Sequence, residues 1–412
     1  MRVTSLRQQR FYAALLFCLL LALVPRAGLA GDVAFWVRWA TYSFEHGLGN
    51  VYQVPDNVYN PVFHYLLWAL GQLLGSAARI RQHIYWVKAL VLVFDFAGAF
   101  WAASLVPERS RRFGLALLLL LNIGYLYNTL IWVQVDAIYT CFAFGAVVLA
   151  VQQRPALSAV GFVLALGTKT QALMFLPPLL LLWLPQWYHQ PRQLLRAGLA
   201  GAGAVLLLLA PFIWGGQQNA LPRILEFNVQ AVGLFPVLTM NAYNAWYLFT
   251  RLDWPAGVPD TRPLAGLTYH AWGRIGFFVA AALALAPLLA AAWQALRVRS
   301  NSPGLALVLL SAAMVPLLFT FFNTRMHERY WHAAVLFLAA YGFVRRDYLP
   351  YVLVSVAYFL QLEAVLRYLN LDYQLLLLRP RFIAGLFALL ILLVFHRLYQ
   401  LAPWRSERVF LG

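Results

Sequence analysis

Charged residues are scarce in this 412-residue chain, at 11% of the sequence. A soluble globular protein carries about 25% charged residues and about 45–50% apolar ones. Here hydrophobic residues make up 63% and aromatic residues 16%, so the chain cannot cover a folded core with polar surface. This composition excludes a soluble globule, a disordered chain, a disulfide-stapled secreted fold and a nucleic-acid-binding domain. The solvent around most of the protein is therefore lipid.

Lysine, acidic residues and cysteine are also few. Only Lys88 and Lys169 among the 31 basic side chains are lysines, and 14 acidic residues leave a formal net charge of +17. The arginines are dispersed between apolar runs without forming one basic face, so no nucleic-acid partner is expected. Their dispersal fits the preference of membrane proteins for positive inner loops. The two cysteines, Cys18 and Cys141, lie inside apolar stretches, so we expect no disulfide.

Apolar runs follow one another along the chain. A helix needs roughly 20 mostly apolar residues to cross a bilayer, or fewer when protein surrounds it. We therefore expect an all-α, polytopic membrane protein with about twelve transmembrane helices, forming a single domain over 1–412. The expected spans lie near 11–30, 84–106, 113–131, 134–151, 156–168, 171–184, 197–214, 268–296, 303–322, 331–344, 349–366 and 382–396.

The first of these spans has two interpretations. Arginines precede its apolar core and Gly28–Ala30 resembles a cleavage site, as in a signal peptide. Pro25 and Arg26 interrupt the segment before that site. We therefore expect an uncleaved helix.

Arginine positions predict the orientation. With the N-terminus inside, each short inner connection holds at least one arginine, such as Arg154, Arg192 or Arg345. A single helix over 156–184 would reverse everything after it and place Arg192 and Arg345 outside. A hairpin of two short helices over 156–184, with Lys169–Gln171 at its outer tip, keeps the pattern.

Two long segments are then expected outside the membrane, 31–83 and 215–267. The run 61–75 is too short and interrupted for a span, so we expect an interfacial helix within the first segment. Both termini lie inside in this arrangement. The outer face therefore carries the irregular sequence on which chemistry would depend.

Several cations on the expected outer face oppose the positive-inside bias. Lys169 lies at the hairpin tip, and Arg325 and Arg329 flank a short outer turn. Each needs an anion nearby: either an acidic side chain such as Glu328 or Asp372, or a bound phosphate at the membrane boundary. Arginine offers two parallel hydrogen bonds to phosphate oxygens and lysine a point charge. Arg367, Arg379 and Arg381, which surround the outer connection before the last span, likewise each need an anion nearby.

Asp32 is the leading candidate for catalysis. It follows the first span directly and lies among aromatic residues. A carboxylate there can accept a proton from a hydroxyl that attacks a sugar carbon. The structural alternative is that Asp32 caps a helix over 33–46.

Other acids and histidines are weaker signals. Asp136 and Glu363 lie near outer span ends and Asp95 lies deeper; each is either part of a site or a structural polar contact. His327 and His332 are five residues apart, whereas the zinc motif HExxH requires four. No second acid pairs with Asp32 in an Asp-x-Asp motif. We expect no metal and no cofactor.

Several stretches together resemble membrane-embedded glycosyltransferases of the GT-C superfamily, most closely bacterial proteins similar to the PIG-V-type mannosyltransferases of GPI-anchor assembly. In chain order they are DVAFWVRWATYSFEHGLGNVY (32–52), YNPVFHYLLWALG (59–71), IWVQVDAIY (131–139), LGTKTQALMFLPPLLL (166–181), NAYNAWYL (241–248) and TRMHERY (324–330). They are spread from 32 to 330, so the resemblance extends over about three quarters of the chain. The hairpin reads Lys-Thr-Gln where relatives have Lys-Pro-Gln. The single acid at the start of the first loop departs from the metal-dependent branch, which has paired acids.

The resemblance implies an enzyme that transfers a sugar, such as mannose, with inversion, from a polyprenyl-phosphate carrier to an acceptor outside the membrane. Asp32 corresponds to the general base. The acceptor would be a glycan, a lipid or a protein, and the protein would sit in a bacterial cytoplasmic membrane with its active site facing outward. The substrate-binding positions that the resemblance implies are Lys169, Gln171, Arg325, His327, Glu328 and Arg329 for the carrier phosphate, Asn241, Asn244 and Trp246 for the sugar and acceptor cleft, and Tyr59, Asn60, Gln134 and Asp136 in the other matching stretches.

Two other functions are compatible with the sequence. A multi-pass transporter or flippase would also have about twelve spans, although transporters usually show internal repeats and broken helices that meet in mid-membrane. A lipid-linked polysaccharide ligase or polymerase would share the long outer loop and the phosphate-binding arginines.

Overall fold

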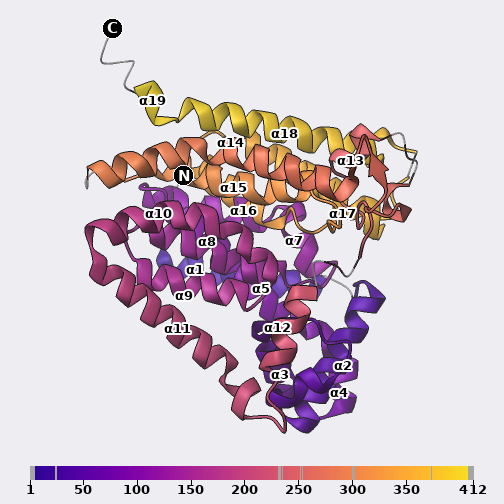
Figure 1. The fold of residues 1–412 in the computed structure, drawn as a ribbon. Helices are drawn as coiled ribbons and strands as arrows, with labels where there is room; N and C mark the ends of the chain where they lie inside the picture. Colours follow the sequence, from indigo (N-terminus) through magenta and orange to yellow (C-terminus); the bar gives the residue numbers. More distant parts are fainter. Residues whose placement is uncertain are drawn as a thin grey trace.

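The structure is a computed structural model that describes residues 5–23, 26–230, 233, 235–250, 252, 254–298, 302–372 and 374–406. Helices make up nearly all of its regular structure (Figure 1). The only strands in this part of the chain are β1 (Pro263–Leu264) and β2 (Leu267–Thr268), an antiparallel pair. The predicted all-α class is confirmed. Pro25, on which the interpretation of the first span depended, lies outside the described residues.

Long apolar helices identify a multi-pass membrane protein. By length and composition, seven described segments could cross a bilayer: α1 (Leu6–Leu23), the continuous helical segment Ala77–Ser104, α11 (Pro191–Trp214), α14 (Tyr269–Arg297), α15 (Leu305–Phe322), α17 (Leu349–Leu366) and α18 (Pro380–Gln400). An eighth forms if α6 (Arg109–Leu120) and α7 (Ile123–Leu130), bent by 56° at their junction, count as one broken span. The predicted number of about twelve is not confirmed.

The sequence predicts more spans than the structure has long apolar helices, because several of the predicted spans are short helices inside the protein. Each of these apolar helices has fewer than 18 residues: α3 (Pro61–Leu74), α8 (Asp136–Val151), α9 (Pro155–Leu166) and α16 (His332–Arg345). Nearly every side chain of α8 and α16 is buried. Helices that other helices surround need not match the thickness of the bilayer, so a hydrophobic run alone does not decide whether they span it.

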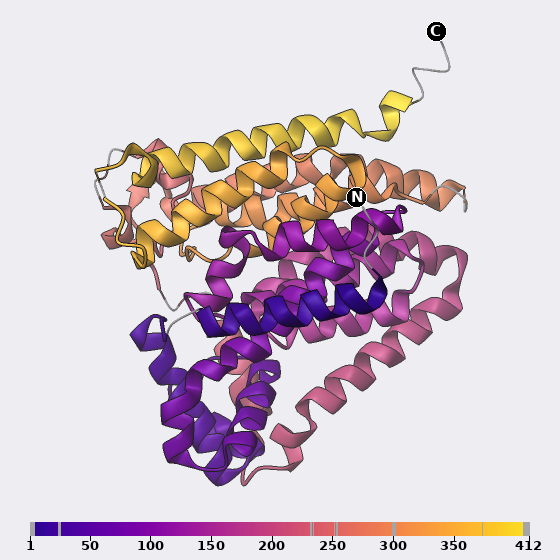
Figure 2. The same cartoon turned by 180° about the vertical axis from the view of Figure 1, so that it is seen from behind.

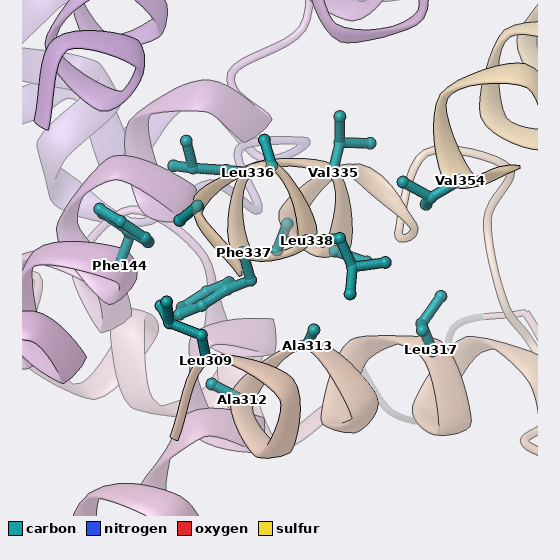
Figure 3. Packing of buried hydrophobic residues seen from close by; sticks show 14 of the residues in the cluster. Phe144, Leu309, Ala312, Ala313, Leu317, Val335, Leu336, Phe337, Leu338 and Val354 are labelled. Carbon is teal, nitrogen blue, oxygen red and sulfur yellow. The ribbon is translucent and has the colours of Figure 1, made fainter. Parts of the chain in front are cut away.

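Helix α16 lies at the centre of the largest hydrophobic cluster (Figure 3). Its Phe337 packs against Phe144 of α8, with the ring centroids 5.2 Å apart. Ala312 and Ala313 of α15 face α16 in the same view. Small residues at such a contact let two helices approach closely, which favours packing within a membrane.

A second hydrophobic cluster forms from the segment expected outside the membrane. It contains α2 (Ala30–His46), η1 (Leu48–Gln53), α3, α4 (Ala77–His83), and α12 (Leu221–Gln230), which lie together at the bottom of Figure 1. The end of α11 joins this cluster at Gly49, where an added Cβ would lie 2.5 Å from the backbone of Gly215. Only glycine allows two backbones to come so close.

The predicted hairpin appears as separate helices. The chain leaves α9 at Leu166 and continues in η3 (Thr170–Phe175) and α10 (Leu176–His189). In Figure 2 the start of α1 and the end of α18 lie toward the same side of the molecule. In Figure 1, α7 and α13 (Ala245–Phe249) lie toward the opposite end. The remaining elements are η2 (Ile84–Trp86), α5 (Val87–Ser104), η5 (Pro255–Gly257), η6 (Leu376–Leu378) and α19 (Pro403–Ser406).

Candidate functional site

Asp32 is the third residue of α2 and points toward the loop before α8. Its carboxylate accepts a hydrogen bond from the side-chain amide of Gln134. The residue at the helix N-cap is Leu29, and no side chain caps this helix. The alternative that Asp32 serves as the cap is therefore wrong. The Asp32 side chain is 21% exposed, so a hydroxyl group can reach it.

The loop that carries Gln134 is held in a strained conformation. Val133 has φ 67°, in the left-handed region that a β-branched residue rarely enters. The indole of Trp36 donates to the Val133 carbonyl at 3.1 Å, and the hydroxyl of Tyr59 donates to Gln134 Oε1 at 3.3 Å. These contacts fix Gln134, which in turn orients Asp32. Such strain persists only where the surroundings enforce it, and it is common at functional sites.

Lys169 and Asp136 form a buried ion pair behind Asp32. Lys169 Nζ lies 2.7 Å from Asp136 Oδ1, with the two side chains 8% and 0% exposed. Asn128 donates to the other carboxylate oxygen at 3.1 Å. Asp136 begins α8, where the helix dipole stabilises a negative charge. Burial lowers the pKa of Lys169, while the Asp136 carboxylate opposes that shift.

Arg329 links three acidic residues. Its guanidinium donates to Glu328 Oε1 at 2.9 Å and lies 3.8 Å from carboxylate oxygens of both Asp32 and Asp136. It also lies over the indole of Trp132, 5.6 Å from the ring centroid. Burial alone would lower the pKa of Arg329, but the carboxylates around it raise it. The arginine therefore stays charged.

A cavity of about 220 Å³ opens next to these residues. Tyr59, Lys169, Gln171, His327 and Arg329 are among the residues that line it. Gln171 donates to the hydroxyl of Tyr330 at 2.7 Å. Burial, followed by the nearby charges of Arg329 and Lys169, lowers the pKa of His327 to about 3, so its imidazole is neutral. The cavity therefore offers both cations and neutral hydrogen-bond donors to a small polar group.

Arg325 lines the same cavity but has an acidic partner that the sequence did not suggest. Its Nε and terminal nitrogen contact Asp260 at 2.6 and 3.1 Å. Thr324 donates to the same carboxylate at 2.8 Å, and a ring nitrogen of His270 lies 3.3 Å from it. The Asp260 carboxylate therefore accepts two hydrogen bonds from this guanidinium, one on each oxygen. Glu328, the acid named from sequence, pairs with Arg329 instead.

Asn60 lines the cavity and connects the end of α9 to α12 through hydrogen bonds. Its amide donates to the Leu166 carbonyl at 2.9 Å, and Asn228 of α12 donates to Asn60 at 2.8 Å. Asn228 also accepts a hydrogen bond from Thr170. These contacts tie the first outer segment and α12 to the hairpin that carries Lys169.

Three of the predicted residues do not line this cavity, although Asn241 forms an isolated β-bridge with His327, which does. Asn241 is exposed with φ 65°, and its carbonyl accepts from Gln361 at 2.9 Å. Asn244 caps α13 and donates to the Thr320 carbonyl at 3.1 Å. Trp246 packs against Tyr269 and lines a separate apolar groove. None of the three is among the residues that line the cavity near Asp32.

The structure therefore brings together most of the predicted residues from segments far apart in the chain. Four further residues contribute to the site without having been predicted: Asn128, Trp132, Asp260 and Tyr330. Trp132 and Tyr330 lie within the stretches IWVQVDAIY and TRMHERY, which is the signal that could have identified them. Within the described residues, no group of three histidine, cysteine or acidic side chains is arranged to hold a metal ion.

Neither a scan of protein-family models nor a search of curated proteins finds a match to this chain.

Proposed function

We propose that the protein is an inverting glycosyltransferase of the GT-C type, which moves a sugar such as mannose from a polyprenyl-phosphate carrier to an acceptor hydroxyl. One observation carries the proposal: a partly exposed carboxylate, Asp32, is oriented by Gln134 beside a polar cavity lined by Lys169 and Arg329. A base, a cationic site for a leaving phosphate and a small cavity between them are what this reaction requires.

In the proposed reaction, the acceptor oxygen attacks the anomeric carbon while its proton passes to the Asp32 carboxylate. The bond between that carbon and the carrier's phosphate oxygen breaks, and polyprenyl phosphate leaves with the bonding electrons. Attack opposite the leaving group inverts the configuration. Gln134 keeps one Asp32 oxygen in place, and the fixed geometry lowers the entropic barrier of the encounter.

The leaving phosphate is assigned to the cationic side of the cavity. Lys169 and Arg329 lie there, each already paired with a carboxylate. Burial raises the pKa of Glu328, opposed by Arg329, so Glu328 takes up a proton more readily as the leaving phosphate gains its second negative charge. Arg329 would then exchange Glu328 for the phosphate. Gln171 and neutral His327 add hydrogen-bond donors.

The proposal includes a location. Cations at this end of the molecule oppose the positive-inside bias, which supports an outward-facing site in a bacterial cytoplasmic membrane. The proposed substrate and orientation rest on the resemblance to GT-C enzymes together with these charges.

A direct test uses the purified protein in sealed lipid vesicles. Polyprenyl-phosphate-linked radiolabelled mannose is supplied with a membrane lipid extract as the acceptor, and a nucleotide-linked sugar serves as the control donor. We expect label to move only from the polyprenyl-linked donor to a new product. Transfer from the nucleotide-linked sugar alone would contradict the proposed donor. A product that grows into long chains would indicate a polymerase.

The transporter alternative has one observation in its favour. Asp95 is fully buried within the apolar helix α5, and acids inside membrane helices often mark ion pathways. The same vesicles distinguish the two functions. A flippase would carry the labelled donor across the bilayer chemically unchanged, whereas a transferase breaks its sugar–phosphate bond.

A further inference from the structure

A cavity of about 320 Å³ lies at the far end of α8 from the Asp32 site. Helix α8 has 16 residues, from Asp136 to Val151, and a helix of that length extends over about 24 Å. Val151 lines this distal cavity, which shares no lining residue with the cavity near Asp32. Its volume is within the usual range for ligand pockets, roughly 300–1,000 Å³. The distal cavity is therefore a separate candidate site.

Three helices end at the distal cavity. Its lining includes Val151, the last residue of α8, His189, the last residue of α10, and Ala295, two residues before the end of α14. Helix α10 packs against both α8 and α14, and the turn after α10 lies beside the end of α14 at the left of Figure 1. The last four carbonyls of a helix have no partner within it, and the helix dipole makes that end negative. Three such ends together favour a positive charge in the cavity.

Gln186 adds a hydrogen-bond acceptor to the lining. The residue is 9% exposed, and its Nε2 donates to the Ala150 carbonyl at 2.7 Å. Because a carbonyl can only accept, this contact determines which end of the side-chain amide is the oxygen. That oxygen, Oε1, is buried and has no hydrogen-bond partner in the protein. A buried oxygen requires a donor, and a ligand in the cavity that Gln186 lines supplies one.

His189 adds a second acceptor. Its Nε2 lies 2.8 Å from the Ala295 carbonyl. Since that carbonyl accepts, Nε2 carries the ring proton, and Nδ1 of the neutral imidazole is an acceptor. The described lining residues include no aspartate, glutamate, lysine or arginine. Acceptors without a carboxylate suit a primary ammonium, which brings three N–H donors, better than a divalent metal ion, which carboxylates would hold.

Exposed arginines near the distal cavity restrict the kind of cation that it can take. Arg154 directly follows Gln153, and Arg192 lies two residues after Gln190; both glutamines line the cavity. The two arginines are exposed and do not line it. They would repel a ligand that carries only positive charge and attract a phosphate that lies beside the ammonium. A zwitterionic group satisfies both the lining and its surroundings.

We propose that the distal cavity binds an ethanolamine phosphate group through its primary ammonium. The ammonium donates to Oε1 of Gln186 and to Nδ1 of His189, and the phosphate faces the exposed arginines. This group occurs both in phosphatidylethanolamine, a membrane lipid, and in free phosphoethanolamine. The site depends on these residues alone and does not require that the protein be a glycosyltransferase.

Lipid binding to the purified full-length protein in detergent tests the proposal, with native mass spectrometry as the measurement. Dioleoylphosphatidylethanolamine is compared with dioleoylphosphatidylcholine, which has the same chains, phosphate and net charge but no N–H group. We expect the wild type to bind the ethanolamine lipid about tenfold more tightly, as the loss of a charge-assisted hydrogen bond implies. Excess free phosphoethanolamine then distinguishes the two sources of the ligand. It displaces the lipid if the headgroup alone is recognised and leaves it bound if the chains contribute, and either result supports the ammonium site.

Three variants connect this preference to the cavity. Gln186→Leu removes the buried acceptor at nearly the same side-chain size, and the preference should fall by about tenfold. His189→Phe removes Nδ1 and keeps a ring; because His189 is only half-buried, this variant remains informative if Gln186→Leu fails to fold. Gln152→Leu is the matched control, since Gln152 is exposed and does not line the cavity, although Val151 and Gln153 do. It should bind like the wild type.

Equal affinity of the wild type for the two lipids would overturn the proposal, because the N–H donors would then contribute nothing. An unchanged preference in folded Gln186→Leu and His189→Phe proteins would overturn the assignment to this cavity. An equal loss in Gln152→Leu would do the same, since it would reflect a general change at this end of the protein. Transfer activity is not measured, so these results are independent of the proposed reaction.

Discussion

The Lys169–Asp136 pair gives a sharp energetic prediction. Removing one member of a buried ion pair costs about 3–5 kcal/mol, because the other charge is left without its partner. The two single variants should not be equal. In Lys169→Met, Arg329 lies only 3.8 Å from Asp136 and can still compensate its charge, so the cost should be near 3 kcal/mol. Asp136→Asn deprives both Lys169 and Arg329 of a carboxylate, so its cost should be near 5 kcal/mol.

The double variant Lys169→Met/Asp136→Asn leaves neither member of the pair charged. It should recover about 2–3 kcal/mol relative to the sum of the single variants, which is the upper part of the range for directly contacting residues. The free energy of unfolding is measured by reversible denaturation in mixed detergent micelles.

Arg38 and Asp56 form the matched control pair. Their side chains are 54% and 32% exposed, so Arg38→Met should cost at most about 1 kcal/mol. The reasoning would be refuted if Lys169→Met and Asp136→Asn each cost no more than the control, or if the double variant showed no recovery.

Three other predictions follow from the described contacts. Asp260→Asn should lower stability by about 2 kcal/mol, since it weakens the charge-assisted hydrogen bonds that Arg325 and Thr324 donate to this buried carboxylate; an unchanged unfolding free energy would contradict this. His327 has its pKa lowered to about 3 by burial, so as pH falls from 7 to 5 the unfolded chain gains a proton near 6.5 that the folded protein does not. Stability should fall by about 2 kcal/mol on this account, and His327→Gln should remove that part of the pH dependence. Single cysteines in 217–219 should react with an impermeant maleimide added outside, whereas those in 107–112 should not; the reverse pattern would invert the proposed orientation.

Composition and charge distribution were sufficient to predict the class of the protein. The scarcity of charge requires lipid around the chain, and lipid requires that backbone groups pair within helices. The break near Lys169 could also be predicted, because one long helix would reverse the arginine pattern. The number of spans could not be predicted, since α9 and α16 are short helices packed against other helices. The length of an apolar run does not show whether such a helix crosses the bilayer.

The candidate site was predictable only in part. Asp32 and Lys169 could be named because each follows or interrupts an apolar run, and Gln134 because it lies in a stretch that carries the resemblance. Their partners could not be assigned, because ion pairing is decided by tertiary packing. Asp260 lies 65 residues before Arg325, and no short-range pattern joins them. Asn244 and Trp246 share a motif, yet their side chains serve the local structure around α13.

The rate of sugar transfer by Asp32→Asn tests the central claim most directly. Asparagine keeps the shape of the side chain and can still contact Gln134, but it cannot take a proton from the acceptor. The assay uses vesicles with polyprenyl-phosphate-linked labelled mannose, and the matched control is Asp56→Asn, which alters an acid of the same outer segment that pairs with Arg38. We expect transfer by folded Asp32→Asn to fall by about 10²–10⁴-fold, the usual contribution of a general base, with Asp56→Asn near the wild-type rate. Wild-type transfer by folded Asp32→Asn would contradict the assignment of Asp32 as the base.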